Sequence, residues 1–271
     1  MKPTEFNNFS DTFVFDTHIP WPTLSIFGWI HGDETAWIKT IDYLIKQIWN
    51  HAMNLLNWKL ILAYGNQVAM QLGEKWERQD VYNMNRTFIK KYLKSISDEY
   101  EIQRTQQLAK ILDESDILLD IHSTSSASDP FIFAEDIWDE LAIAKSIFSG
   151  NTIVWWEAMA KKIWIIDWDT NGYMHALWKT ALTLECGNHL DAWAAQVWKQ
   201  TATRLLSHLW MIDNKQESEE NNGTGYEMYG IETKTAKDFT FAKDFRNFTK
   251  IQVWDLVYSD AEKDVYAQED F

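Results

Sequence analysis

Apolar residues follow two patterns along this chain. Short runs that are apolar almost throughout predict buried strands, and longer segments with apolar positions every three or four residues predict helices. The predicted strands span residues 23–30, 58–63, 116–121, 151–155 and 180–185, and the predicted helices span 34–50, 97–114 and 189–211. We expect Asp98 and Glu99 in the first turn of the second helix, where acidic residues are favourable. Strands that alternate with helices are typical of an α/β layer with a largely parallel sheet.

The pattern changes in the last quarter of the chain. Residues 213–225 (DNKQESEENNGTG) are polar, charged and glycine-containing, which is typical of a linker. Short strand-like runs follow at 226–233, 239–245, 251–258 and 264–267. We therefore expect a larger domain over 1–212, a linker over 213–225 and a small β-rich domain over 226–271 that is truncated at its end.

Composition narrows the classes of partner. The 271 residues carry a formal net charge of −15, and 46% of them are hydrophobic, as in a folded globular protein. Nucleic acids and anionic membrane surfaces both select clustered Lys and Arg, so we expect neither as a partner. A small anionic substrate is compatible with this charge, because a local pair of arginines outweighs the distant field at contact range.

Targeting and redox features favour a cytoplasmic protein. The first residues are polar and form no apolar signal segment, and no run of about 18 apolar residues predicts a spanning helix. Cys186 is the only cysteine, so the chain cannot form an internal disulfide, which suits a reducing compartment. The sequence predicts no particular oligomeric state.

Histidine and glutamate stand where two predicted strands end. His31 and Glu34 follow the first strand, three residues apart, and His122 follows the strand over 116–121. The carboxyl ends of parallel strands meet at one edge of a sheet, where ligands bind. Two histidines and one glutamate there form a zinc site of the catalytic type, which leaves one coordination position for water. The alternative is a hydrogen-bonded turn, which a single H-x-x-E motif does not exclude.

Two further groups carry candidate chemistry. Glu185 ends the strand over 180–185. A carboxylate at this position either forms an ion pair, caps the following helix or acts as a general base. Asn85 and Arg86, with Arg78 upstream, offer planar hydrogen-bond donors to a carboxylate or a polarised carbonyl. A surface salt bridge is the alternative for the arginines.

Four sequence blocks together resemble the succinylglutamate desuccinylase/aspartoacylase family, a branch related to the zinc carboxypeptidases. The blocks are FGWIHGDETAW, DVYNMNRTF, LLDIHSTSS and ALTLECGNHLDA, in the family's order over about residues 25–192. The segments FRNFTKIQVWDLVYSD and VYAQED resemble the family's C-terminal β domain. The resemblance implies a zinc-carboxypeptidase-like three-layer α/β domain with a largely parallel or mixed sheet, followed by a small β domain.

The resemblance also implies a zinc-dependent hydrolase. It implies that His31, Glu34 and His122 hold one zinc ion per chain and that Glu185 is the general base that acts on metal-activated water. The expected reaction is cleavage of the amide bond of a small, anionic N-acyl amino acid. Two alternatives share these motifs: a metallocarboxypeptidase that acts on peptides, and a degenerate member that binds a metal or ligand without catalysis.

Substrate binding follows from the same resemblance. It implies that Asn85 and Arg86 hold the substrate carboxylate and that Arg78 polarises the scissile carbonyl. Asn83 departs from the family, which usually has Asp at this position of its D-x-N-R block. We expect this change to weaken the support of the site more than its chemistry.

Tryptophan stands at several positions where the family pattern has glycine. The chain has 16 Trp and only 10 Gly, whereas average usage of about 7% predicts roughly 19 glycines. Trp29, Trp37, Trp178 and Trp193 lie within or beside the family blocks. Some bacterial lineages read UGA as glycine, so we predict that these four residues are glycines in the natural protein. A genuinely tryptophan-rich core is the alternative.

Overall fold

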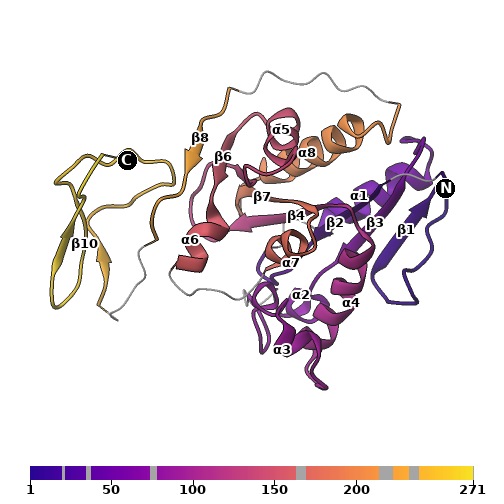
Figure 1. Ribbon diagram of the computed structural model, residues 1–271, viewed down its shortest axis with the longest axis horizontal. Coiled ribbons are helices and arrows are strands. Elements are labelled where there is room, and N and C mark those ends of the chain that lie inside the picture. Colours follow the sequence, from indigo (N-terminus) through magenta and orange to yellow (C-terminus); the bar gives the residue numbers. More distant parts are fainter. Residues whose placement is uncertain are drawn as a thin grey trace.

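A computed structural model of the chain shows a three-layer α/β domain and a small separate sheet (Figure 1). The structure describes residues 1–19, 22–34, 38–73, 78–162, 169–213, 222–231 and 238–270. A mixed sheet forms the middle layer of the larger part, and helices cover both of its faces. The fold class predicted from the sequence is confirmed.

In the described part of the chain, eight strands form the central sheet. They are β1 (Thr12–Asp16), β2 (Thr23–Gly28), β3 (Lys59–Tyr64), β4 (Ile117–Thr124), β5 (Phe131–Phe133), β6 (Asn151–Val154), β7 (Thr180–Asn188) and β8 (Gly225–Glu227). Their order in the sheet is β1-β3-β2-β4-β7-β5-β6-β8. Strands β3, β2, β4 and β7 are mutually parallel, whereas β1 and β5 pair antiparallel with β3 and β7. All residues of β2 are buried, because helices cover both faces of the sheet, and such strands read as continuous apolar runs.

Helices form the two outer layers. They are α1 (Ile38–Trp49), α2 (Gln67–Gly73), α3 (Lys90–Leu93), α4 (Tyr100–Glu114), α5 (Glu140–Ile147), α6 (Trp156–Lys162), α7 (Thr170–Ala176) and α8 (Ala194–His208). Helices α1, α5 and α8 share one buried hydrophobic cluster with the sheet, which includes Leu44 and Leu205. Helices α4 and α7 share a second cluster with the sheet, which includes Leu108 and Met174. Two clusters, one for each set of helices, explain the three-layer arrangement.

The C-terminal segment contributes to both sheets. Strand β8 pairs with β6 at the edge of the central sheet. The separate antiparallel sheet contains β9 (Thr240–Phe241), β10 (Leu256–Ser259) and β11 (Asp264–Tyr266), in the order β11-β10-β9. Residues 214–221, the middle of the predicted linker, lie outside the described residues. The domain boundaries expected from the sequence stay predictions.

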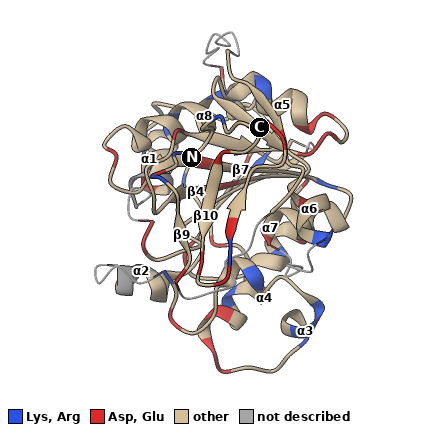
Figure 2. Ribbon diagram, turned by 90° about the vertical axis from the view of Figure 1, so that its left-hand side faces the viewer, with Lys and Arg blue, Asp and Glu red and all other residues tan. Residues whose placement is uncertain are grey.

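Charged residues are spread along the described part of the chain (Figure 2). Lys and Arg residues are interspersed with the more numerous Asp and Glu residues (Figure 2). Within the described ranges, none of the helices has the length and apolar character that crossing a bilayer requires.

Helix α4 begins later than its sequence pattern predicts. The helix starts at Tyr100, because Ser97 Oγ accepts the backbone N–H of Glu99 at 3.1 Å in a local turn. Asp98 and Glu99 therefore precede the helix, and the expectation that they lie in its first turn is wrong. Glu101 is the acidic residue of that turn.

Helix α8 also begins later than expected. Strand β7 continues to Asn188, whose side-chain Oδ1 accepts the N–H of Leu190 at 2.9 Å and whose carbonyl accepts the N–H of Asp191 at 3.0 Å. This turn delays the helix to Ala194. His189, expected to open the helix, lies in the turn instead.

The backbone conformation differs among the four tryptophans that were predicted to be glycine. Trp29 has φ 68° and Trp178 has φ 62°, both in the left-handed region that favours glycine. Trp193 has a helical φ of −83°, so its backbone makes no such demand. Trp37 lies outside the described residues.

Candidate functional site

Three adjacent parallel strands converge on the candidate site. Strand β4 lies between β2 and β7, with Gly28 paired to Ile121 and His122 paired to Glu185. Because the three strands run in the same direction, their carboxyl ends lie along one edge of the sheet. That edge presents His31 just beyond β2, His122 in β4 and Glu185 in β7.

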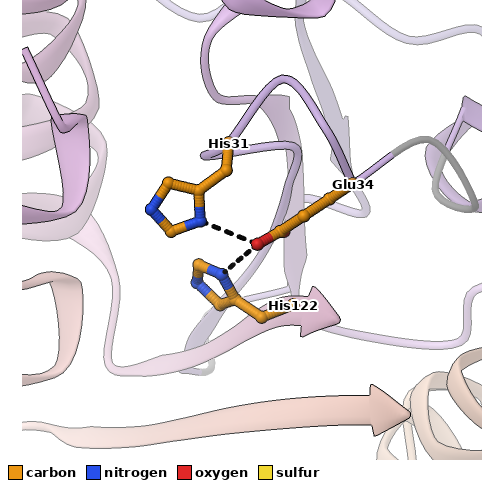
Figure 3. Close-up of side chains that lie close together, drawn as sticks. All are labelled: His31, Glu34 and His122. Atoms are coloured by element: carbon orange, nitrogen blue, oxygen red, sulfur yellow. Dashed lines mark hydrogen bonds and ion pairs between the residues drawn. The ribbon is translucent and has the colours of Figure 1, made fainter. Parts of the chain in front are cut away.

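His31, Glu34 and His122 meet at one point (Figure 3). Glu34 Oε1 lies 2.7 Å from His31 Nδ1 and 3.3 Å from His122 Nδ1. All three residues are buried, and one ligand atom from each lies within 4.8 Å of the others. Two zinc bonds of about 2.0–2.1 Å span roughly 4 Å, so these atoms are close enough to share one ion. The structure thus contains a group that can hold a metal.

Buried oxygen atoms in this group lack hydrogen-bond partners. Within the described part of the chain, neither Glu34 Oε2 nor Glu185 Oε2 has one. Burying a carboxylate oxygen without a hydrogen bond or a cation is unfavourable. The unpartnered oxygens and the two-His, one-Glu set fit a zinc ion.

Neighbouring side chains orient both histidine rings. Asn83 Oδ1 lies 3.1 Å from His31 Nε2, and Asp120 Oδ2 lies 3.1 Å from His122 Nε2. Thr170 Oγ1 donates a hydrogen bond to the same Asp120 oxygen. If each Nδ1 were to ligate a metal, the ring N–H would lie on Nε2, where these oxygens can accept it. Asn83 therefore presents an acceptor oxygen to His31, although its difference from the family's Asp had predicted weaker support of the site.

Burial and charge shift the pKa values of the group in different directions. Burial alone would raise the pKa of Glu34, but His122 and His31 outweigh it and lower that pKa. Burial lowers the pKa of His31 in spite of Glu34. Burial also acts to lower the pKa of His122, but Asp120 and Glu34 outweigh it and raise the pKa well above its usual value. An ionised Glu34 is the form that a metal needs.

Glu185 stands beside the metal group with a perturbed pKa. Burial raises the pKa of Glu185 to about 7, while His122 opposes this shift and Glu34 adds to it. A carboxyl group that titrates near neutrality is suited to accept and return protons. The adjacent Cys186 is buried, and burial raises the pKa of its thiol, so Cys186 lacks the character of a nucleophile.

Arg78 reaches the metal group from a separate segment. One guanidinium nitrogen lies 3.0 Å from His31 Nε2, and the other lies 3.9 Å from Glu34 Oε1. Its backbone carbonyl accepts the N–H of Gly32 at 2.9 Å, which ties this segment to the loop between His31 and Glu34. The structure therefore brings Arg78 to the site predicted for it.

Asn85 and Arg86 lie next to a residue that supports the site. Both belong to the short 3₁₀ helix η2 (Met84–Arg86), which Asn83 caps by accepting the N–H of Asn85 at 3.0 Å. Asn85 Oδ1 accepts the backbone N–H of Thr170 at 3.2 Å, and Arg86 donates to the carbonyl of Asn85 at 2.7 Å. The contact of Asn83 with His31 connects this short helix to the metal group.

Sequence reasoning missed three residues of the site. Asp120 had a detectable signal, because it stands two residues before His122 on one strand and such residues share a face. Thr170 had none, since only the packing of α7 brings it to Asp120. His189 was expected to begin a helix, and its contact with Ser123 becomes visible only in the fold.

Known proteins resemble this chain in sequence. The succinylglutamate desuccinylase/aspartoacylase catalytic domain matches residues 20–211. A succinylglutamate desuccinylase from Serratia proteamaculans is 34% identical over 85 residues, which are 31% of this chain. The match spans only 24% of that protein's length.

Solved structures share the fold. The succinylglutamate desuccinylase from Vibrio cholerae superimposes with a TM-score of 0.74 and 18% identity, covering 96% of this chain and 78% of that one. The product-bound ectoine utilization protein EutE (DoeB) from Ruegeria pomeroyi gives a TM-score of 0.72 and 16% identity, covering 99% and 86% of the two chains. These identities establish the fold alone. The domain match over residues 20–211 goes further, and this chain belongs to the succinylglutamate desuccinylase/aspartoacylase family.

Proposed function

We propose that this protein is a zinc-dependent hydrolase that cleaves the amide bond of a small N-acyl amino acid. The observation that carries the proposal is the convergence of His31, Glu34 and His122 beside Glu185. Family membership supports the substrate class, because its relatives include succinylglutamate desuccinylases.

In this proposal the converging residues hold zinc and Glu185 moves the protons. When bound, zinc lowers the pKa of a water molecule and polarises a carbonyl group. Glu185 accepts a proton from the attacking water and returns it to the nitrogen of the leaving amine. Arg78 donates hydrogen bonds to the carbonyl oxygen as negative charge develops there. The products are a free amino acid and a small carboxylic acid.

The test is hydrolysis of a defined panel by the zinc-loaded protein. The panel contains N-succinyl and N-acetyl derivatives of glutamate and aspartate, together with a peptide that has a free C-terminus. We expect release of free amino acid from an N-acyl compound, loss of this activity with a chelator and recovery with zinc. Preferred cleavage of the peptide would favour the metallocarboxypeptidase, and zinc binding without any turnover would favour the degenerate binder.

Arg86 is expected to select substrates with a free carboxylate. Its planar guanidinium forms paired, charge-assisted hydrogen bonds with a carboxylate, and a lysine cannot reproduce that geometry. Arg86→Ala should raise KM by about 10–100-fold with a smaller change in kcat, and Arg86→Lys should recover only part of this loss. Steady-state kinetics on the best N-acyl amino acid measure both effects.

A methyl ester of the same substrate provides the control for Arg86. The unmodified protein should cleave the ester poorly, and Arg86→Ala should reduce the difference between acid and ester. Equal cleavage of acid and ester by the unmodified protein would show that no carboxylate is recognised.

A further inference from the structure

One histidine connects the loops that carry the proposed site. His189 Nδ1 lies 2.6 Å from Ser123 Oγ, and His189 Nε2 lies 3.7 Å from Asp33 Oδ2. Ser123 follows His122 directly, and Asp33 precedes Glu34 directly. The imidazole of His189 is therefore hydrogen-bonded to the neighbour of one proposed ligand and lies close to the neighbour of a second.

The backbone around His189 adds a third connection. Its N–H donates to the carbonyl of Thr124 at 3.0 Å, which joins the turn after β7 to the end of β4. Glu185 stands four residues earlier in β7. The side chains of His189 and Ser123 are both buried, so solvent competes little for their hydrogen bond.

We propose that His189 is a positioning residue for the metal site, an inference that rests on the proposed function. It holds the loop of Glu34, the end of β4 and the end of β7 at fixed separations, so that the ligand atoms and Glu185 meet. Without this support, the loop that carries Glu34 would move away from the position needed to bind the metal. Metal affinity and turnover would then decrease together.

The test compares His189→Ala and His189→Asn with a matched pair elsewhere in the fold. His208 Nδ1 lies 3.0 Å from Ser146 Oγ, which reproduces the serine–histidine contact at an exposed position. We expect His189→Ala to weaken zinc binding by about 10–100-fold in a chelator competition and to lower kcat. Asn places a polar atom near the position of Nδ1, so His189→Asn should recover part of both. His208→Ala should change neither.

The outcomes separate this inference from the proposed function. If the unmodified protein bound no zinc, the proposed function would fail. If the unmodified protein bound zinc and His189→Ala bound it equally well, at a lower melting temperature, His189 would be a structural residue only and the positioning role would be wrong.

A second, independent observation concerns the tryptophans. Thirteen described residues other than glycine have a positive φ, and seven of them are tryptophans. The seven are Trp29, Trp58, Trp138, Trp155, Trp178, Trp210 and Trp254. Asn, Asp and His, which tolerate this region, account for five of the others, whereas a bulky side chain there is a genuine outlier. Tryptophan makes up 16 of the 271 residues, so this enrichment needs a cause.

The end of helix α7 shows what the backbone requires. The N–H of Trp178 donates to the carbonyl of His175 at 3.0 Å, and the N–H of Lys179 donates to the carbonyl of Met174 at 3.1 Å. These two bonds define a Schellman motif with Trp178 at the left-handed position, which is usually glycine.

Helix α8 ends in the same way. The N–H of Trp210 donates to the carbonyl of Ser207 at 3.0 Å, and the N–H of Met211 donates to the carbonyl of Leu206 at 2.8 Å. Trp210 has φ 58° at the position where the motif favours glycine.

A tight turn near the C-terminus places a third tryptophan in this conformation. The N–H of Asp255 donates to the carbonyl of Gln252 at 2.9 Å. Trp254 is the third residue of this turn and has φ 71°, as in a type II turn, where this position requires glycine or asparagine.

The side chains of the seven tryptophans are either exposed or bury an indole N–H that has no hydrogen-bond partner. Five of the indoles are exposed large hydrophobic groups: Trp138, Trp155, Trp178, Trp210 and Trp254. Trp29 and Trp58 are buried, and within the described part of the chain their indole N–H groups have no hydrogen-bond partner. An unpartnered buried donor is unfavourable, and glycine has none in its side chain.

We infer that these seven residues are glycines in the natural protein, encoded by a codon that its organism reads as glycine. The family blocks and the backbone both indicate glycine at Trp29 and Trp178. The backbone alone adds five positions: Trp58, Trp138, Trp155, Trp210 and Trp254. Glycine adopts a positive φ without steric cost, and a tryptophan does not.

Gene and protein test this inference separately. We expect UGA codons at the seven positions and glycine at each of them in peptides of the natural protein by mass spectrometry. UGG codons, or natural peptides that carry tryptophan there, would overturn the inference.

Stability provides a readout that does not depend on the codons. A chain with all seven Trp→Gly substitutions should melt more than about 15 °C above the chain as written, because each site loses backbone strain. Trp198→Gly is the control, since this residue lies inside helix α8, where glycine is unfavourable and should lower the melting temperature. A sevenfold variant that melts below the chain as written would contradict the inference.

Discussion

Glu185→Gln is expected to lower kcat by about 10²–10⁴-fold while zinc stays bound. Glutamine keeps the size of the side chain but cannot accept a proton, and Glu185 is not one of the converging ligands. Turnover and zinc content of the same preparation measure the two effects. A Glu185→Gln protein with near-normal kcat on its best substrate would rule out the role of general base.

The pH profile provides a second measurement of Glu185. Its pKa is raised to about 7, so the carboxylate fraction increases as the pH rises through this value. Since only the carboxylate accepts a proton, kcat/KM should fall about tenfold per pH unit on the acidic side of the pKa. A bound cation favours the carboxylate and moves this limb to lower pH. The limb should be absent in Glu185→Gln.

Glu135 provides a matched control for the substitution. It also has a raised pKa caused by burial, it accepts the N–H groups of Trp155 and Glu157, and it is not one of the converging residues. Glu135→Gln should therefore leave kcat and the acidic limb nearly unchanged. An equal loss in both variants would mean that Glu185 acts through stability alone.

His122→Ala is expected to abolish the stabilisation of the protein by zinc. A ligand that binds only the folded state stabilises it by about 2.7 kcal/mol at one hundred times its Kd, which corresponds to a rise in melting temperature of roughly 5–10 °C for a chain of this size. Removing one of the three converging side chains should weaken binding by more than about 100-fold, because residues that merely support ligands already contribute 10–100-fold. Thermal melts with and without zinc measure this change.

Surface histidines provide the control for the metal experiment. His18 is largely exposed and lies outside the converging group, so His18→Ala should keep the full zinc-induced shift. Glu34→Gln serves as a second ligand variant if His122→Ala does not fold. An undiminished zinc-induced shift in both ligand variants would place the metal elsewhere.

Several features followed from the sequence because each depends on local pattern. Apolar runs located β2, β3, β4 and β7 to within a few residues, since strands buried on both faces must be apolar throughout. The positions of His31, Glu34 and His122 at strand ends predicted that these three residues would meet, because the carboxyl ends of parallel strands share one edge of a sheet. Tryptophan at positions where the family has glycine led to the prediction that Trp29, Trp37, Trp178 and Trp193 are glycines in the natural protein.

Other features were decided only by contacts between distant segments. Thr170 reaches Asp120 across 50 positions of the chain, and His189 reaches Ser123 across 66, so no local pattern encodes either contact. The pKa of Glu185 depends on burial and on the charges that folding places around it. The turn that contains Trp254 is tied to a later segment, because the N–H of Trp254 donates to the carbonyl of Ala267 at 2.9 Å. Sequence patterns report local periodicity and charge, whereas positioning, desolvation and backbone strain arise when the layers pack together.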